Sequence, residues 1–139
     1  MKTVLTALAT WSVCRGARCY LERSSRRETT HLGGHVKLTA LWNHGAAFGL
    51  PIGCKWLPVL SGGVLAALLM QRKKAPVAAG LILGGGLSNL QERVGEGRVY
   101  DYLRFPKAPK PLDRYVYNLA DLAVFAGGIA LLLREKTKD

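Results

Sequence analysis

Cysteine is scarce in this sequence, and no residue pattern typical of a metal site is present. The three cysteines are an odd number with no Cys-x-x-Cys pair, so they predict neither a disulfide framework nor a zinc site. His31 and His35 have the spacing of metal ligands on a helix, but the two glycines between them, Gly33 and Gly34, argue against a helix. We therefore expect no metal.

Acidic residues are also few, and this imbalance limits the classes of partner. Nine acidic residues stand against 20 basic ones, which gives a formal net charge of +11. Aromatic residues make up 8% of the chain and do not alternate with the basic residues, as a surface that stacks on nucleic-acid bases would require. Anionic lipid headgroups explain the charge better, so we expect membrane lipids and not nucleic acid as a partner.

Apolar residues and glycine are plentiful. Hydrophobic residues account for 49% of the 139 positions, 16 more are glycine, and the charges are grouped between apolar runs. The length fits one domain, residues 1–139, and the grouping of charges is typical of a small helical membrane protein. A soluble bundle with buried helices is the alternative, because two of the apolar runs are shorter than the roughly 20 residues that a bilayer requires.

Four apolar runs predict helices at 3–20, 56–70, 75–90 and 115–133. The first lacks a following small-residue cleavage site, so we interpret it as a retained helix. The basic run at 71–74 predicts a cytoplasmic turn, and four spans would then place both termini on the cytoplasmic side of a multi-pass protein. Glycines in the third run favour close packing against neighbouring helices.

Residues 35–48 differ from these runs. Val36, Leu38 and Ala40 alternate with Lys37 and Thr39, which is the period of a strand. Residues 94–114 read as a polar loop, because several prolines exclude a helix there. The expected fold is an all-α membrane protein with four transmembrane helices and a small extracytoplasmic β element between the first two.

Two of the apolar runs carry an amide and a carboxyl three residues apart. Asn118 precedes Asp121 in the last run, and Asn89 precedes Glu92 at the end of the third. On a helix such residues share one face. A carboxylate within an apolar membrane helix costs about 2.5 kcal/mol or more, so it is rarely present without a partner or a task. The two runs together therefore predict a paired-carboxyl site, with a helix cap or a solvated helix end as the structural alternatives.

Paired carboxyls are suited to hydrolysis. Two carboxyls a few ångström apart do not both ionise cheaply, so one stays protonated while the other acts as general base on a water molecule between them. That water attacks the scissile carbonyl group, and the protonated carboxyl protonates the carbonyl oxygen. The two groups are expected to titrate as a unit.

Three segments resemble the signature blocks of the lipoprotein signal peptidases, or signal peptidase II, which are bacterial intramembrane aspartic proteases. They are WNHGAAFGL at 42–50, GGGLSNLQERVGEGRVYDYL at 84–103 and YNLADLAV at 117–124. The family patterns are roughly N-x-G-A-A-F, then G-N-x-x-D-R followed by V-x-D-F, and finally F-N-x-A-D. The order and spacing agree from about residue 36 to the end of the chain.

The resemblance implies an aspartic endopeptidase of the bacterial cytoplasmic membrane. It would remove signal peptides from diacylglyceryl-modified prolipoproteins by cutting before the lipidated cysteine, as a monomer and without metal or cofactor. The catalytic carboxyls implied by the resemblance are Asp121 and Glu92. The supporting residues would be Asn89, Asn118, Arg93 and Asp101, and the residues lining the substrate cleft would be Asn43, Gly45, Ala46, Ala47 and Phe48.

The sequence departs from the family patterns at three places. Glu92 stands where the family has an aspartate, Ser88 replaces a glycine, and the segment from Cys14 to Arg18 lacks the acid of the family's D-x-x-x-K. These departures leave two alternatives open: a homologue that binds lipopeptide without turnover, and a membrane protein whose acids serve only helix assembly. If Glu92 performs no chemistry, the partners left for Asp121 are Glu96 and Asp101.

Overall fold

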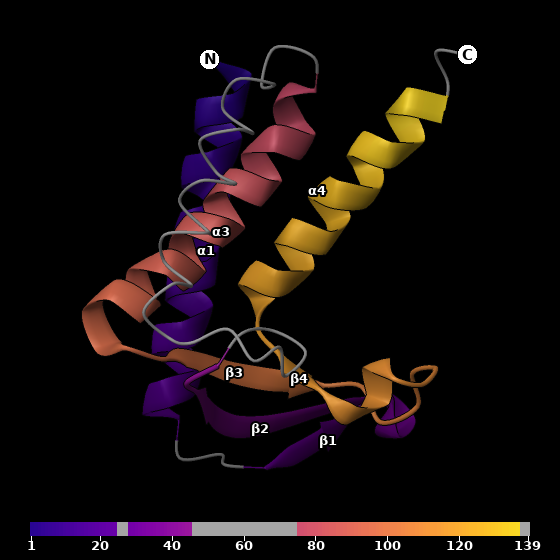
Figure 1. Cartoon of the computed structure of the whole chain (residues 1–139). Helices are drawn as coiled ribbons and strands as arrows, with labels where there is room; N and C mark the ends of the chain where they lie inside the picture. Colours follow the sequence, from indigo (N-terminus) through magenta and orange to yellow (C-terminus); the bar gives the residue numbers. More distant parts are fainter. Residues whose placement is uncertain (25–27, 46–74, 137–139) are drawn as a thin grey trace.

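The computed structural model describes residues 1–24, 28–45 and 75–136. Within them are three helices and a four-stranded sheet, with one short 3-10 turn between the first two strands and another between the last two (Figure 1). The helices are α1 (Lys2–Arg23), α3 (Pro76–Glu96) and α4 (Leu119–Lys136). The strands and turns are β1 (Thr29–His31), η1 (Leu32–Gly34), β2 (Val36–Asn43), β3 (Val99–Arg104), η3 (Leu112–Arg114) and β4 (Val116–Tyr117).

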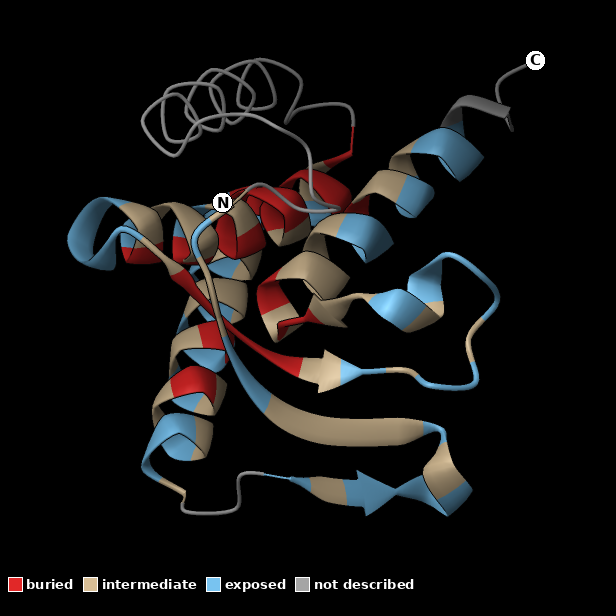
Figure 2. Ribbon diagram, turned by 60° about the horizontal axis from the view of Figure 1, so that its bottom comes forward, coloured by how far each residue is buried: buried red, intermediate tan, exposed pale blue. Residues whose placement is uncertain are grey.

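The sheet is antiparallel throughout, with the strands in chain order β1-β2-β3-β4. Trp42 pairs with Tyr100 and Leu41 with Asp101, and an irregularity interrupts the β2–β3 register between Leu38 and Leu41. All three helices rise from the same side of the sheet, and both chain termini lie at the helix ends farthest from it (Figure 1). Buried side chains are concentrated on α3, which packs between α1 and α4, and on β3 (Figure 2).

Glycine allows α1 and α4 to pack closely on α3. A Cβ at Gly84 would lie 2.5 Å from the carbonyl oxygen of Ala7 on α1, and a Cβ at Gly85 would lie 2.5 Å from the carbonyl oxygen of Ala120 on α4. Gly80 likewise leaves no room for a side chain beside α1. The prediction that glycines of the third run serve close helix packing is confirmed at these three positions.

The expectation of an all-α protein with four transmembrane helices is wrong. The predicted helices at 3–20, 75–90 and 115–133 are present with shifted bounds, whereas the one at 56–70 lies outside the described residues. The strand expected at 35–48 is β2, but it belongs to a four-stranded sheet. Part of the supposed loop at 94–114 is strand β3, because Val99, Tyr100 and Tyr102 favour extended backbone.

No helix in the described ranges is both long and apolar enough to cross a membrane. Charged side chains interrupt each of them: Lys2, Arg15 and Arg18 on α1, the Glu92–Arg93 pair on α3, and Asp121 at the start of α4.

Candidate active site

A cluster of polar side chains lies where α3, β3 and the start of α4 meet. Asn118 precedes α4, and its side-chain Oδ1 accepts a hydrogen bond of 2.9 Å from the backbone N–H of Asp121. In return, the backbone N–H of Asn118 donates to Oδ2 of Asp121 at 3.0 Å. This reciprocal arrangement is that of a capping box, in which the residue before the helix and the third helical residue satisfy each other's N–H groups. It fixes the carboxyl of Asp121 at the helix start.

The amide group of Asn118 also joins this carboxyl to a second one. Its Nδ2 donates to Oδ1 of Asp101 on β3 at 2.9 Å and to Oδ1 of Asn89 on α3 at 3.0 Å. Asn89 completes the ring, because its own Nδ2 donates to Oδ1 of Asp121 at 2.9 Å. Two asparagines from different elements thus hold the carboxyls of Asp101 and Asp121 in one hydrogen-bonded unit.

Burial changes the proton affinity of both carboxyls. Burial, together with the charge of Asp121 nearby, raises the pKa of Asp101 to about 7, although hydrogen bonds from Asn43 and Asn118 oppose the shift. Burial likewise raises the pKa of Asp121 against the hydrogen bonds from Asn118 and Asn89 and the charge of Arg93. The pKa of Asp101 thus lies in the range that acid-base chemistry on a water molecule near neutral pH requires.

Glu92 lies in a different network. Its Oε2 accepts a hydrogen bond of 2.9 Å from the backbone N–H of Tyr100, and its carboxylate forms ion pairs with Arg15 and Arg18 of α1 at 3.6 and 3.7 Å. Burial raises the pKa of Glu92, opposed by the Tyr100 hydrogen bond and by both arginines. The structure therefore brings Asp101, and not Glu92, into the hydrogen-bonded unit of Asp121.

A second polar segment leads away from Asp101. Nδ2 of Asn43 donates to Oδ2 of Asp101 at 3.0 Å, while its Oδ1 accepts a hydrogen bond of 2.9 Å from the backbone N–H of Gly45. Nη1 of Arg93 donates to the carbonyl oxygen of Gly45 at 3.1 Å. Asn43 thus contacts Asp101 directly, and Gly45 and Arg93 are connected to it through Asn43; the cleft-lining role expected for Asn43 and Gly45 stays a prediction. The remaining predicted cleft residues lie outside the described residues: Ala46, Ala47 and Phe48.

No sequence pattern pointed to Tyr102 or Cys14 as site residues. The hydroxyl oxygen of Tyr102 accepts a hydrogen bond of 3.1 Å from the backbone N–H of Leu119, which ties β3 to the first turn of α4. Burial raises the pKa of Tyr102 to about 12. Burial, with the charges of Asp121 and Glu92, raises the pKa of the Cys14 thiol. For Asp101, which was expected only as a supporting residue, the sequence signal for a catalytic role is its place as an acid within the extended run VYDYL.

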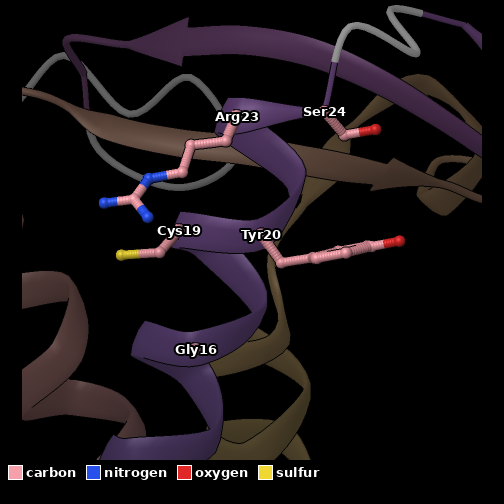
Figure 3. A pocket seen from close by; sticks show the side chains of 5 residues that line it. All are labelled: Gly16, Cys19, Tyr20, Arg23 and Ser24. Atoms are coloured by element: carbon pink, nitrogen blue, oxygen red, sulfur yellow. The ribbon is translucent and has the colours of Figure 1, made fainter.

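A surface hollow at the end of α1 does not belong to this cluster. Cys19 and Arg23 point to one side of the helix, whereas Tyr20 and Ser24 point to the other (Figure 3). No carboxyl lines it. Within the described ranges, no group of three or more His, Cys, Asp or Glu side chains is arranged to hold a metal ion.

The family of the chain is given by its similarity to known proteins. The family model described as signal peptidase (SPase) II matches residues 8–136. The lipoprotein signal peptidase of Nitrobacter hamburgensis is 39% identical over 107 residues, covering 68% of this chain and 65% of that protein. The one of Syntrophomonas wolfei is 40% identical over 121 residues, covering 82% and 75%. The chain therefore spans just under two thirds of the Nitrobacter relative's length.

Two solved structures, each described as a bacterial membrane enzyme, have the same fold. The first has a TM-score of 0.83 at 21% identity and covers 99% of this chain and 90% of its own. The second has a TM-score of 0.82 at 20% identity, with coverages of 95% and 90%. A family match that runs over nearly the whole chain, together with relatives at 39–40% identity, shows that the chain belongs to the signal peptidase II family.

Proposed function

We propose that the chain is an aspartic endopeptidase that removes signal peptides from lipid-modified prolipoproteins, cutting before the diacylglyceryl cysteine. The observation that carries the proposal is the shared asparagine: the Asn118 amide hydrogen-bonds Asp101, and the Asn118 backbone N–H hydrogen-bonds Asp121. The substrate class is supported by the relatives, which are named lipoprotein signal peptidases.

Asp101 and Asp121 form the catalytic pair in this proposal. Their raised pKa values support a resting state with one shared proton. The ionised carboxyl removes a proton from a water molecule as the water oxygen bonds to the scissile carbonyl carbon, and the protonated carboxyl gives its proton to the carbonyl oxygen. Collapse of this diol intermediate breaks the C–N bond: the proton taken from water passes to the leaving nitrogen, and one diol hydroxyl returns a proton to the other carboxyl, which restores the shared proton.

The neighbouring polar groups have supporting roles. Asn89 and Asn118 orient the two carboxyls by the hydrogen bonds described above. Asn43 does the same for Asp101 through its hydrogen bond to Oδ2. Arg93 holds Gly45 and lowers the cost of a negative charge on the pair. Asn43 and Gly45 would line the substrate cleft, and this role stays a prediction for Ala46, Ala47 and Phe48.

We infer that the enzyme acts at the bacterial cytoplasmic membrane as a monomer, with both termini on the cytoplasmic side. The fold is that of bacterial membrane enzymes. Both termini lie at the same end of the helices, away from the sheet (Figure 1). The net charge of +11 suits contact with anionic lipid.

The test is cleavage of a lipidated precursor, followed by its shift on a gel. Asp101→Asn and Asp121→Asn should each lower kcat by about a thousandfold or more, because an amide neither accepts the water proton nor supplies the acidic one. Glu28→Gln is the matched control, since Glu28 is exposed and pairs only with Lys37 among the described residues. It should cleave like wild type.

Near-normal cleavage by either Asp variant would overturn the catalytic pair. A wild-type protein that binds a lipopeptide inhibitor but never cleaves would instead identify a homologue without turnover.

A further inference from the structure

Glu92 is buried, and yet the proposed chemistry leaves it without a task. It lies in the last part of α3 and is 4% exposed. Burying a carboxylate costs several kcal/mol unless hydrogen bonds and opposite charges compensate it. The compensation here comes from three groups: the backbone N–H of Tyr100, Nη1 of Arg15 and Nε of Arg18.

The hydrogen bond from the Tyr100 backbone N–H to Glu92 takes the place of a bond that a neighbouring strand would otherwise form with β3. Among the described residues, β4 pairs with β3 only at Leu103 and Arg104, so it does not reach the part of β3 that carries Asp101. The N–H of Tyr100 goes to the carboxylate of Glu92 at 2.9 Å. Glu92 therefore satisfies a backbone donor on the edge of β3 that β4 leaves uncovered.

The side chain of Tyr100 is also fixed. Its ring lies 5.0 Å from the ring of Trp42, its cross-strand partner, and Trp42 is in turn stacked by the guanidinium of Arg98 at 4.0 Å. Successive side chains of a strand point to opposite faces, so Asp101 points away from this aromatic contact. A Tyr100 held by both backbone and ring fixes the Cα position of Asp101, the next residue.

The arginines connect this anchor to the first helix. Nη2 of Arg18 binds both carboxylate oxygens of Glu96, at 2.6 and 2.7 Å, and lies 3.3 Å from Glu22. Nη1 of Arg15 and Nε of Arg18 are buried and form no hydrogen bond within the described structure, so their compensation comes from the nearby charge of Glu92. Glu92, on α3, thus connects its helix to α1 and to β3.

We propose that Glu92 is a positioning residue that sets the place of Asp101 relative to Asp121 through the backbone of Tyr100. This inference rests on the proposed function of the Asp101–Asp121 pair. Glu92 touches neither carboxyl and does not act on the substrate. Its role is to hold β3 in the position in which the Asn118 amide can donate its hydrogen bond to Asp101.

The test compares Glu92→Gln with Glu92→Leu. Glutamine keeps the length and an oxygen that accepts from Tyr100, so kcat should stay above about a tenth of wild type. Leucine has no acceptor; a displacement of Asp101 on the order of 1 Å should lower kcat about a hundredfold while KM changes little. Glu96→Gln is the matched control, because Glu96 binds the same Arg18 and should leave kcat unchanged.

The pH profile adds a readout that a purely structural role would not move. A larger separation weakens the repulsion between Asp101 and Asp121, so the upper apparent pKa of kcat should fall in Glu92→Leu and stay in place in Glu92→Gln. If the leucine variant does not fold, amide hydrogen exchange of Tyr100 in the wild type decides instead. A Tyr100 amide that is protected in wild type and exchanges faster in Glu92→Gln, whose neutral oxygen is a weaker acceptor than a carboxylate, supports the anchor. An unprotected amide in wild type, or equal exchange in the two proteins, overturns it.

Two results for Glu92 would also contradict the proposal. Wild-type kcat in Glu92→Leu would show that the anchor is not needed, and a Glu92→Gln variant as inactive as Asp101→Asn would make Glu92 a catalytic acid. Failure of the proposed function is distinguishable, because it would be seen as cleavage by Asp101→Asn or Asp121→Asn, whatever the Glu92 variants do.

Discussion

At the scale of single residues, Asn118 has the most contacts that matter to the site. Its side chain caps α4 through its oxygen and binds Asp101 and Asn89 through its nitrogen, while its backbone N–H binds Asp121. Both hydrogens of the amide nitrogen are therefore used. A side chain with all its donors used has one orientation, so the carboxyls that it binds are held in one relative position before any substrate arrives.

The raised pKa of Asp101 predicts a pH dependence of stability. The pKa rises from 3.8 to about 7 on folding, so the folded state binds this proton more tightly than the unfolded state. The stability that protonated Asp101 contributes is present below about pH 4 and is lost as the pH rises to about 7. A shift of about three units corresponds to at most about 4 kcal/mol.

Asp101→Asn should therefore lose less stability between about pH 4 and pH 7 than the wild type does. Thermal unfolding of both proteins across that range measures the difference. The other raised carboxyls, Asp121 and Glu92, are present in both proteins, so their direct contributions largely cancel in the comparison. If the stability of the two proteins changed in parallel with pH, the pKa of Asp101 would not be raised on folding.

At the scale of elements, the sequence predicted the helices of the described residues but not the sheet. The runs at 3–20, 75–90 and 115–133 have the length and apolar content of helices, and helices form there. Strand β3 was not predicted, because its six residues include the charged Asp101 and Arg104 and follow a polar helix end. Together these features are typical of a loop. Strand pairing joins residues 58 positions apart, such as Trp42 and Tyr100, and no local pattern contains that information.

The site was predicted only in part for the same reason. Asn89, Asn118 and Asp121 lie in helical runs or beside them, so the three-residue spacing revealed them. The same spacing pointed to Glu92, which shares α3 with Asn89 but makes its contacts with α1 and with the backbone of β3. Asp101 joins the pair only because β3 runs past the start of α4, and that is a property of the sheet.

The packing of α3 against its neighbours predicts a sharp difference between glycines. Gly84→Ala and Gly85→Ala would each place a Cβ 2.5 Å from a backbone carbonyl oxygen, so a helix must move, at a cost of about 1–3 kcal/mol. Gly95→Ala meets nothing within 4 Å on the same helix and should be neutral or stabilising by up to about 1 kcal/mol.

Unfolding and cleavage should be measured on all three glycine variants. Gly85→Ala should lower activity as well as stability, because the displaced residue, Ala120, is next to Asp121. Gly84→Ala faces α1 and should mainly affect stability. Equal stability of Gly84→Ala and Gly95→Ala would contradict the close packing of α1 on α3.

At the scale of the whole molecule, charge is distributed so that the chain can be attracted to an anionic surface. The 20 basic residues exceed the 9 acidic ones, and Lys107, Lys110 and Arg114 are exposed in the segment that joins β3 to β4. This segment belongs to the sheet end of the molecule, whereas both termini lie at the opposite end (Figure 1). A basic segment near an anionic lipid surface contributes about 1 kcal/mol per residue.

The last prediction follows from this charge. The kcat/KM for a lipidated precursor should be about fivefold or more higher with anionic than with zwitterionic lipid, since about 1 kcal/mol corresponds to that factor. Added salt should reduce the advantage, because exposed charges are screened over about 8 Å at physiological ionic strength. Replacing Lys107, Lys110 and Arg114 together by glutamine should remove most of it, whereas Lys2→Gln, at the other end of the molecule, should not. Equal kcat/KM in both lipids would mean that the net charge serves another purpose. If the triple variant and Lys2→Gln lost the same share of the anionic-lipid advantage, the effect would depend on total charge and not on contact between the sheet end and the lipid.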